Sequence, residues 1–390
     1  MKVEAAERTN LVQEYFFSAK LKQIDEMRKA GADIINLGIG SPDLPPSPAT
    51  INKLTGEAAR PDVHGYQSYT GIPALRKAMS DWYLKYFKVN LNPDGEILPL
   101  IGSKEGIMHI SMAFINPGDE VLVPDPGYPT YSSATKLAGG IVRTYDLKET
   151  NGWLPDFNEL ETSDLTRVKL MWVNYPHMPT GTRSSEILFE RIVKFGQKHN
   201  ILICNDNPYS FILNDDHLSI LSVAAAMDIA LELNSLSKSH NMAGWRVGMV
   251  AGNKEYIQTI LKVKSNMDSG MFMPLQAAAV EALANDNDWY RNLNDIYSRR
   301  RRFAEEIMDT IGCSFNPSQT GLFLWGRLPD NIKSCGDYVE EILQKCHVFI
   351  TPGFIFGKNG NRYVRISLCS TEEKLGKAKK RISDHFNKNI

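Results

Sequence analysis

The segment from Val168 to Asn205 indicates the fold class most directly. It begins with the apolar run Val168-Lys169-Leu170-Met171-Trp172-Val173-Asn174, continues after a turn with the stretch SEILFERIVKFGQKHN at residues 185–200, and ends with Ile201-Leu202-Ile203-Cys204-Asn205. The first and last runs have the length and apolar character of buried strands, whereas the middle stretch repeats its apolar residues at the spacing of an amphipathic helix. This order predicts two parallel strands joined by a crossover helix.

The same alternation extends to both sides of this segment. The stretch Pro73–Lys88 places proline at the first position of a predicted helix. The other candidate strands are short apolar runs: Ala32–Leu37, Glu96–Ile101, Val121–Pro124, Ile141–Leu147, Ile229–Leu233 and Val247–Ala251. Repeated strand–helix–strand units predict an α/β fold, with a mostly parallel sheet between helices on both faces.

After about Asp288 the pattern changes. A charged helical stretch, Trp289–Thr310, contains four consecutive arginines, and is followed by strands alternating with helices. These candidate strands are Leu322–Leu328, Val348–Ile350 and Tyr363–Leu368. We expect an N-terminal arm at residues 1–45 that joins a small domain, a large domain at 46–287 and a small α+β domain at 288–390. We interpret the arginine run as a solvated helix face, because no aromatic residues are interleaved with it.

Composition narrows the function classes. The 390 residues include 44 lysines and arginines and 45 aspartates and glutamates, for a formal net charge of −1. This balance argues against nucleic acid or an anionic membrane as a partner. No apolar run reaches the ~18 residues that span a bilayer, and the first ten residues do not read as a secretory signal. The five cysteines and eight histidines lack the spacing of a metal site or a redox pair, so we expect a cytoplasmic protein without a bound metal.

The most informative polar stretch follows the candidate strand Ile229–Leu233. It places hydroxyls at Ser235 and Ser237, an amine at Lys238 and a guanidinium at Arg246. A lone lysine after a strand is usually a surface residue, but this grouping suits a phosphate-bearing aldehyde. The amine condenses with the carbonyl to an imine, and the hydroxyls and guanidinium hold the phosphate.

The pattern S-x-S-K followed by G-x-R resembles the lysine segment of the fold-type I, class I/II pyridoxal-phosphate aminotransferases. The resemblance implies a pyridoxal-phosphate transferase fold of type I, with a seven-stranded-type sheet in a large cofactor-binding domain. It also implies Lys238 as the catalytic residue, with Ser235, Ser237 and Arg246 at the cofactor. The same residues fit the S-x-x-K motif of penicillin-recognising serine enzymes, but S-D-N and K-T-G are absent from the sequence.

Further elements match the family around the cofactor. In Asn205-Asp206-Asn207-Pro208-Tyr209 the resemblance places Asp206 on the ring nitrogen and Tyr209 on the phenolic oxygen. The glycine turn at residues 102–106 opens a predicted helix and matches the phosphate loop, with Ser103 and Lys104 as contacts. Tyr128 matches the aromatic residue that lies over the pyridine ring.

Two matches concern the subunit and the substrate. Tyr66 begins the pattern Y-x-x-x-x-G-x-x-x-L-R, in which the family's tyrosine reaches the cofactor of a neighbouring subunit; Tyr69 is the alternative. This implies a homodimer with composite active sites. Arg365, in a candidate strand, matches the arginine that binds the α-carboxylate of the amino acid, and Gly40 matches the glycine beside that carboxylate.

The sequence departs from the family at one position. The segment NYPHMPTG at residues 174–181 matches N-x-P-x-N-P-T-G, except that Met178 replaces an asparagine whose amide bonds the phenolic oxygen. Asn174 is retained as a candidate cofactor contact. Three explanations are open: Tyr209 and Arg365 suffice, Asn174 or His177 takes over, or the enzyme does something other than ordinary transamination.

The resemblance implies a ping-pong transfer of an amino group from an L-amino acid to a 2-oxo acid through the Lys238 imine. The alternatives are a C–S lyase or related enzyme on the same fold, and a cofactor-binding protein with weak turnover. Residues 261–270 resemble a loop near the substrate in broad-specificity and diaminopimelate-type members. The sequence does not select the amino acid.

Overall fold

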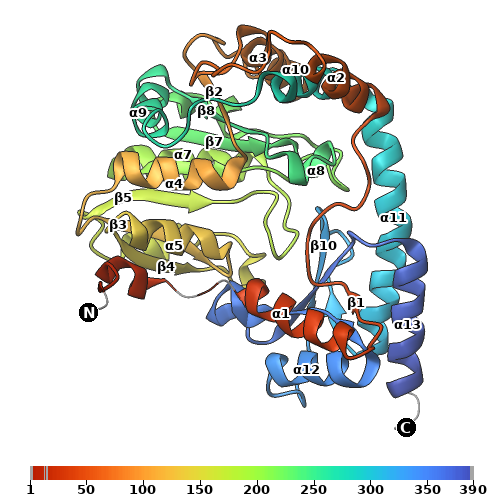
Figure 1. The fold of residues 1–390 in the computed structure, drawn as a ribbon. Helices are drawn as coiled ribbons and strands as arrows, with labels where there is room; N and C mark the ends of the chain where they lie inside the picture. Colours follow the sequence, from red (N-terminus) through yellow and green to blue (C-terminus); the bar gives the residue numbers. More distant parts are fainter. Residues whose placement is uncertain (1–2, 13, 15, 387–390) are drawn as a thin grey trace.

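A seven-stranded sheet forms the centre of the larger part of the molecule (Figure 1). The computed structural model describes residues 3–386 apart from Gln13 and Tyr15. The strands follow one another across the sheet as β2 (Ile97–Leu100), β8 (Gly248–Gly252), β7 (Ala230–Ser235), β6 (Leu202–Asp206), β5 (Val168–Val173), β3 (Glu120–Asp125) and β4 (Ile141–Asp146). Strand β8 is antiparallel to both neighbours, and the pairs from β7 to β4 are parallel. The predicted α/β fold with a mostly parallel sheet is confirmed.

Helices cover both faces of this sheet, and the strand side chains alternate between the two layers. Leu170 and Trp172 of β5 pack in the core that contains residues of α4 (Ser103–Phe114), α5 (Pro129–Leu137) and α9 (Lys254–Lys264). Met171 and Val173 point into the opposite core, with residues of α7 (Glu186–His199). Burial on both faces explains why the strands read as continuous apolar runs. The remaining helices of this part are α2 (Pro48–Ala58), α3 (Pro73–Phe87), α6 (Phe157–Glu161), α8 (Leu236–Ser239) and α10 (Met273–Leu283).

Helix α7 shows how local sequence sets an element's ends. The hydroxyl of Ser185 accepts a hydrogen bond from the backbone N–H of Leu188, which caps the first turn. Asn200 follows the last turn with φ 53° and ends the helix in the left-handed conformation that asparagine tolerates. The helix therefore lies one residue inside each end of the predicted range.

The smaller part of the molecule contains a four-stranded sheet in the order β12 (Thr351–Pro352), β13 (Tyr363–Ser367), β10 (Phe323–Arg327) and β9 (Ser314–Phe315). The long helix α11 (Asn287–Thr310) runs from the larger part into the smaller one, beside α13 (Glu372–Phe386) (Figure 1). Helices α1 (Phe16–Lys29) and α12 (Cys335–Cys346) complete it. Short 3-10 helices span Glu7–Leu11, Glu149–Asn151, Ile220–Ser222, Ala226–Asp228, Ala243–Trp245, Gly353–Phe356 and Lys358–Gly360. The domain boundaries stay predictions.

Two details differ from the sequence prediction. The expected strand Ala32–Leu37 is only β1 (Ile35–Asn36), and it pairs in parallel with β11 (Val348–Phe349) rather than with the large sheet. The arginine run is not wholly solvated: Arg300 is buried, and its guanidinium forms two hydrogen bonds of 2.6 and 2.9 Å with the carboxylate of Asp43. Both contacts join segments far apart in the sequence, so no local pattern announces them. None of the described helices is long and apolar enough to cross a bilayer.

Candidate active site

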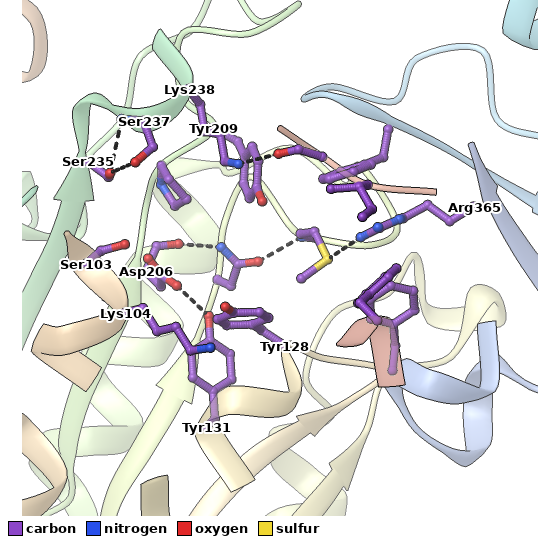
Figure 2. A pocket seen from close by; sticks show the side chains of 18 of the residues that line it. Ser103, Lys104, Tyr128, Tyr131, Asp206, Tyr209, Ser235, Ser237, Lys238 and Arg365 are labelled. Atoms are coloured by element: carbon purple, nitrogen blue, oxygen red, sulfur yellow. Dashed lines mark hydrogen bonds between the residues drawn. The ribbon is translucent and has the colours of Figure 1, made fainter. Parts of the chain in front are cut away.

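A pocket of about 680 Å³ lies at the carboxyl edge of the central strands (Figure 2). Asp206 ends β6, Lys238 follows β7 in α8, and Ser103 and Lys104 open α4. Arg365, on β13 of the small sheet, enters from the opposite side. The pocket therefore lies where the two parts of the molecule meet, at the sheet edge where open α/β folds bind ligands.

The amine of Lys238 points into this pocket. Its Nζ donates a hydrogen bond to the backbone oxygen of Gly40 at 2.5 Å. Burial lowers the pKa of Lys238 below its ordinary value, and the positive charges of Arg365 and Arg246 lower it further. A lowered pKa increases the neutral fraction of the amine, which is the nucleophilic form.

Asp206 is buried at the floor of the pocket. Its Oδ2 accepts a hydrogen bond of 2.9 Å from the hydroxyl of Tyr131, whereas Oδ1 is buried with no hydrogen-bond partner among the described residues. Burial raises the pKa of Asp206 to about 6. A buried oxygen left without a donor costs free energy, so this site favours a ligand that brings a donor to Oδ1.

Hydroxyl and cationic groups gather at the start of α4. The hydroxyls of Ser235 and Ser237 lie 2.9 Å apart, and Ser103 begins the helix. Gly102 has φ 82°, and a Cβ on it would overlap the guanidinium of Arg246. The glycine thus lets the guanidinium approach the helix N-terminus, where backbone N–H groups and the dipole favour an anion.

Three more predicted residues line the same pocket. Lys104 lines the pocket with these hydroxyl and guanidinium groups. Partial burial and the charge of Arg246 lower the pKa of Lys104. Tyr128 packs edge-to-face on Tyr131, with ring centroids 5.6 Å apart. Tyr209 is buried, and its burial raises the pKa of its hydroxyl.

Asn174 also lines the pocket, but its amide bonds the surrounding loops. Nδ2 donates to the backbone oxygen of Asp206, and Oδ1 accepts a hydrogen bond of 2.8 Å from the backbone N–H of Met178. The side chain therefore joins the ends of β5 and β6. His177, the other suggested substitute for the missing asparagine, is buried outside the pocket lining and bonds Thr180.

Arg365 is held by the backbone and by aromatic rings. Its Nη2 donates to the backbone oxygen of Gly38 at 2.7 Å, and its Nη1 lies 3.3 Å from the sulfur of Met178. The guanidinium carbon lies 3.8 Å from the ring centroid of Phe323 and 4.6 Å from that of Phe356. Gly40 is adjacent, and a Cβ on it would overlap the ring of Phe323.

Tyr66 is the one predicted site residue that is absent from the pocket lining described within this chain. Its side chain is 93% exposed. The other predicted residues, from Gly40 to Arg365, all line the one pocket.

Comparison with known proteins identifies the family. The model of class I and II aminotransferases matches residues 32–382. The chain belongs to this family. The LL-diaminopimelate aminotransferase of Natranaerobius thermophilus is 40% identical to the present aminotransferase over 386 residues, covering 98% of this chain and 100% of that protein. The enzyme of the same name from Aquifex aeolicus is 37% identical and covers 98% and 99%.

Solved structures agree with this assignment. The apo structure of BacF from Bacillus subtilis superposes on the aminotransferase with a TM-score of 0.94 at 34% identity, over 99% of this chain and 98% of that one. A probable N-succinyldiaminopimelate aminotransferase from Thermus thermophilus gives 0.87 at 31% identity, over 94% and 99%. The present enzyme is a pyridoxal-phosphate-dependent aminotransferase of the type I fold, as the resemblance implied.

The residues of the aminotransferase fit this cofactor. Oδ1 of Asp206, which has no hydrogen-bond partner among the described residues, suits a protonated ring nitrogen. The hydroxyls and guanidinium at the start of α4 suit a phosphate: Ser103, Ser235, Ser237 and Arg246. Lys238 would supply the amine for the aldehyde.

Sequence reasoning missed several residues that line the aminotransferase pocket, among them Tyr131 and residues of α1. Tyr131 bonds Asp206 from α5 and stacks on Trp172, with ring centroids 5.0 Å apart. Phe17 and Leu21 reach the pocket from α1. The place of Tyr131, three residues after the predicted Tyr128, could have indicated from the sequence that it lies near the pocket. Nothing in the sequence of α1 indicates that this helix reaches the pocket.

Proposed function

We propose that this aminotransferase moves the amino group of an L-amino acid to a 2-oxo acid in two half-reactions, with Lys238 as the catalytic residue. The observation that carries the proposal is that the amine of Lys238, Oδ1 of Asp206 and the guanidinium of Arg365 face one pocket from three separate segments. A nucleophile, a buried acid and a carboxylate-binding fork are the groups this chemistry needs.

The remaining roles follow from chemistry and position. Ser103, Ser235, Ser237 and Arg246 would hold the phosphate, with Lys104 beside them, and Tyr128 would pack on the ring. When bound, pyridoxal phosphate supplies an aldehyde that takes the amino group and a ring that withdraws electrons from the substrate's Cα.

The protein's own groups act on the substrate around this centre. Arg365 binds the α-carboxylate in a fork-to-fork pair and so fixes the orientation of Cα. Nζ of Lys238 takes the proton from Cα in one half-reaction and returns a proton in the other, because its lowered pKa suits a general base. Asp206 holds a proton at the ring nitrogen through Oδ1, and Tyr131 fixes the orientation of its carboxylate.

The test is covalent labelling at one residue. Purified protein is loaded with pyridoxal phosphate, reduced with borohydride and mapped by mass spectrometry. We expect the label on Lys238 and none on Lys104, which lines the same pocket and serves as the internal control. A label elsewhere would overturn the assignment. Incubation with amino acids then separates transfer, which gives the amine form of the cofactor, from elimination, which gives pyruvate and ammonia.

We further propose that two copies of the chain share their active sites through Tyr66. Tyr66 is 93% exposed, and its neighbours Tyr69, Met267 and Phe272 are also exposed large side chains. The segments that carry them are packed together: Lys264 bonds the backbone of Tyr69, and the ring of His64 stacks on Phe272. Such an exposed apolar group is typical of a covered interface.

Complementation between two defective chains tests the shared site. Lys238→Ala and Tyr66→Phe each impair a different half of a composite site, so mixed dimers contain one site with both residues intact. We expect activity to rise when the two variants are unfolded and refolded together, and light scattering to give twice the mass of one chain. Additive activities would contradict the composite site.

The compartment remains a proposal. The five cysteines are free and buried, which fits a reducing environment, and we propose that the enzyme works in the cytoplasm. Fractionation of cells with an antibody tests this.

A further inference from the structure

Six apolar side chains line the pocket, and we call these six the apolar wall: Phe17, Leu21, Ile39, Met178, Phe323 and Phe356. Four of them lie beside the guanidinium of Arg365: Phe17, Met178, Phe323 and Phe356. We propose that the amino-acid substrate carries an apolar side chain, aliphatic or aromatic, that packs on this wall. The inference rests on the proposed function, in which Arg365 binds the α-carboxylate.

The first step is the position of the carboxylate site within the wall. Phe323 and Phe356 contact the guanidinium of Arg365 through their ring faces, and the ring of Phe17 lies 5.7 Å from it. The sulfur of Met178 lies 3.3 Å from the same group. A substrate held there by its carboxylate has its Cα next to this apolar surface. We therefore infer that its side chain packs against the apolar wall.

The second step is the distribution of charge. Figure 2 shows Lys104, Asp206 and Lys238 across the pocket from Arg365. Among the described lining residues, Arg365 is the charged side chain that contacts Met178, Phe323 and Phe356 of the apolar wall, and Ser18 is a polar lining residue on α1. A second carboxylate or ammonium group on the substrate's side chain would lie against these apolar groups of this chain, where a charge is unfavourable.

The third step is the rigidity of the wall. Phe17 and Leu21 are four residues apart and lie on one face of α1. Lys20 and Gln23, on the same helix, bond the carboxylate of Glu340 in α12 at 2.9 and 2.8 Å. Phe16 packs edge-to-face on Phe354, with ring centroids 5.6 Å apart. These contacts hold α1, and with it Phe17 and Leu21, over the pocket.

The proposed substrate differs from the one in the names of the chain's relatives. LL-diaminopimelate carries a second amino group and a second carboxylate at the far end of its chain. With an apolar wall at that end, we expect kcat/KM for leucine, methionine and phenylalanine to be at least about 10²-fold higher than kcat/KM for LL-diaminopimelate, aspartate or glutamate.

The experiment is a single-turnover screen. The holoenzyme is mixed with each amino acid, and conversion of the bound cofactor to its amine form is followed by absorbance. The expected ranking supports the inference, and equal or faster conversion by LL-diaminopimelate or a dicarboxylic amino acid overturns it. Conversion by no amino acid would instead overturn the proposed function, so the two failures are distinguishable.

A charge placed in the wall provides the second measurement. Leu21→Arg puts a guanidinium on the pocket face of α1, and Ala19→Arg puts the same group on its exposed face. We expect Leu21→Arg to raise the glutamate-to-leucine ratio at least about tenfold and Ala19→Arg to leave it unchanged. If Leu21→Arg fails to bind the cofactor, Leu21→Ala should lower the ratio of kcat/KM for leucine to kcat/KM for alanine about 10-fold. An unchanged ratio in a folded Leu21 variant would overturn the proposal.

Discussion

The sulfur of Met178 lies 3.3 Å from Nη1 of Arg365, at the position where the family resemblance implies an asparagine amide. A thioether is a weak acceptor and offers no donor, so Met178 packs the arginine but adds no hydrogen bond to a ligand in the pocket. Among the explanations left open by the sequence, the geometry leaves Tyr209 and Arg365 in the pocket and His177 outside its lining.

Restoring the amide should therefore change the cofactor's environment. With Met178→Asn we expect the lysine–cofactor linkage to titrate about one pH unit lower. The reason is that a donor at the phenolic oxygen stabilises the form in which that oxygen carries the greater negative charge. Absorbance recorded against pH measures the shift. Met178→Leu keeps the volume without a donor and should leave the titration where it is; equal shifts in both variants would mean that the position only packs.

Asp206 links pH to the stability of the cofactor-free protein. Burial raises its pKa to about 6, against an ordinary value of 3.8. Between about pH 4 and 6 the folded state therefore keeps a proton that the unfolded chain has lost. The free energy of unfolding falls as the pH rises through this window, by up to about 3 kcal/mol, and the loss is complete above it.

Asp206→Asn should remove this effect. We expect the cofactor-free variant to unfold at higher denaturant concentration than the wild type at pH 8, and at a similar concentration at pH 4. Transamination should fall by about 10²–10³-fold because the charge at the ring nitrogen is lost. Denaturation at the two pH values measures the first effect and steady-state kinetics the second. A variant less stable than the wild type at pH 8 would show that the ionised aspartate does not destabilise the folded protein there.

Gly102 fixes the distance between α4 and Arg246. A Cβ at this position would overlap the guanidinium, and the φ of 82° is unfavourable for alanine. Gly102→Ala should displace Arg246 and weaken cofactor affinity roughly tenfold or more, since a charge-assisted hydrogen bond contributes about 1.5–3 kcal/mol. Fluorescence titration with pyridoxal phosphate measures the affinity. Gly56→Ala, where a Cβ meets nothing within 4 Å, is the control, and equal affinities in the two variants would refute the role.

Lys264 and Asp268 form a buried ion pair beneath the loop that carries Tyr66. Nζ lies 3.0 Å from Oδ1 and 2.8 Å from Oδ2, and the side chains are 4% and 9% exposed. Asp268→Asn retains an acceptor for the backbone N–H of Gly270 but leaves the ammonium uncompensated. We expect a loss of about 3–5 kcal/mol in the free energy of unfolding.

An exposed pair of the same spacing is the control for that measurement. Lys77 and Asp81 lie 2.7 Å apart, with side chains 69% and 61% exposed. Asp81→Asn should cost at most about 0.5 kcal/mol. Chemical denaturation compares the two variants, and similar losses would show that burial adds nothing to the first pair.

Features with a local physical cause could be predicted from the amino-acid order alone. Apolar runs between helical stretches specified the strands, because a strand buried on both faces needs apolar residues throughout. Ser185 and Asn200 specified the ends of α7 through their own capping chemistry. The groups at Lys238, Asp206 and Arg365 were readable because each follows or lies within a strand of recognisable pattern.

The way in which these segments meet became visible in the folded protein and could not be predicted from any one segment. No local sequence pattern indicates that β8 is antiparallel to its neighbours, or that β1 pairs with β11 outside the large sheet. The same is true of the ion pair between Arg300 and Asp43, which are 257 positions apart. The same holds for Tyr131 beside Asp206, and for α1 over the pocket. These contacts depend on the packing of segments distant in the chain, and their energy appears only when both surfaces are buried together.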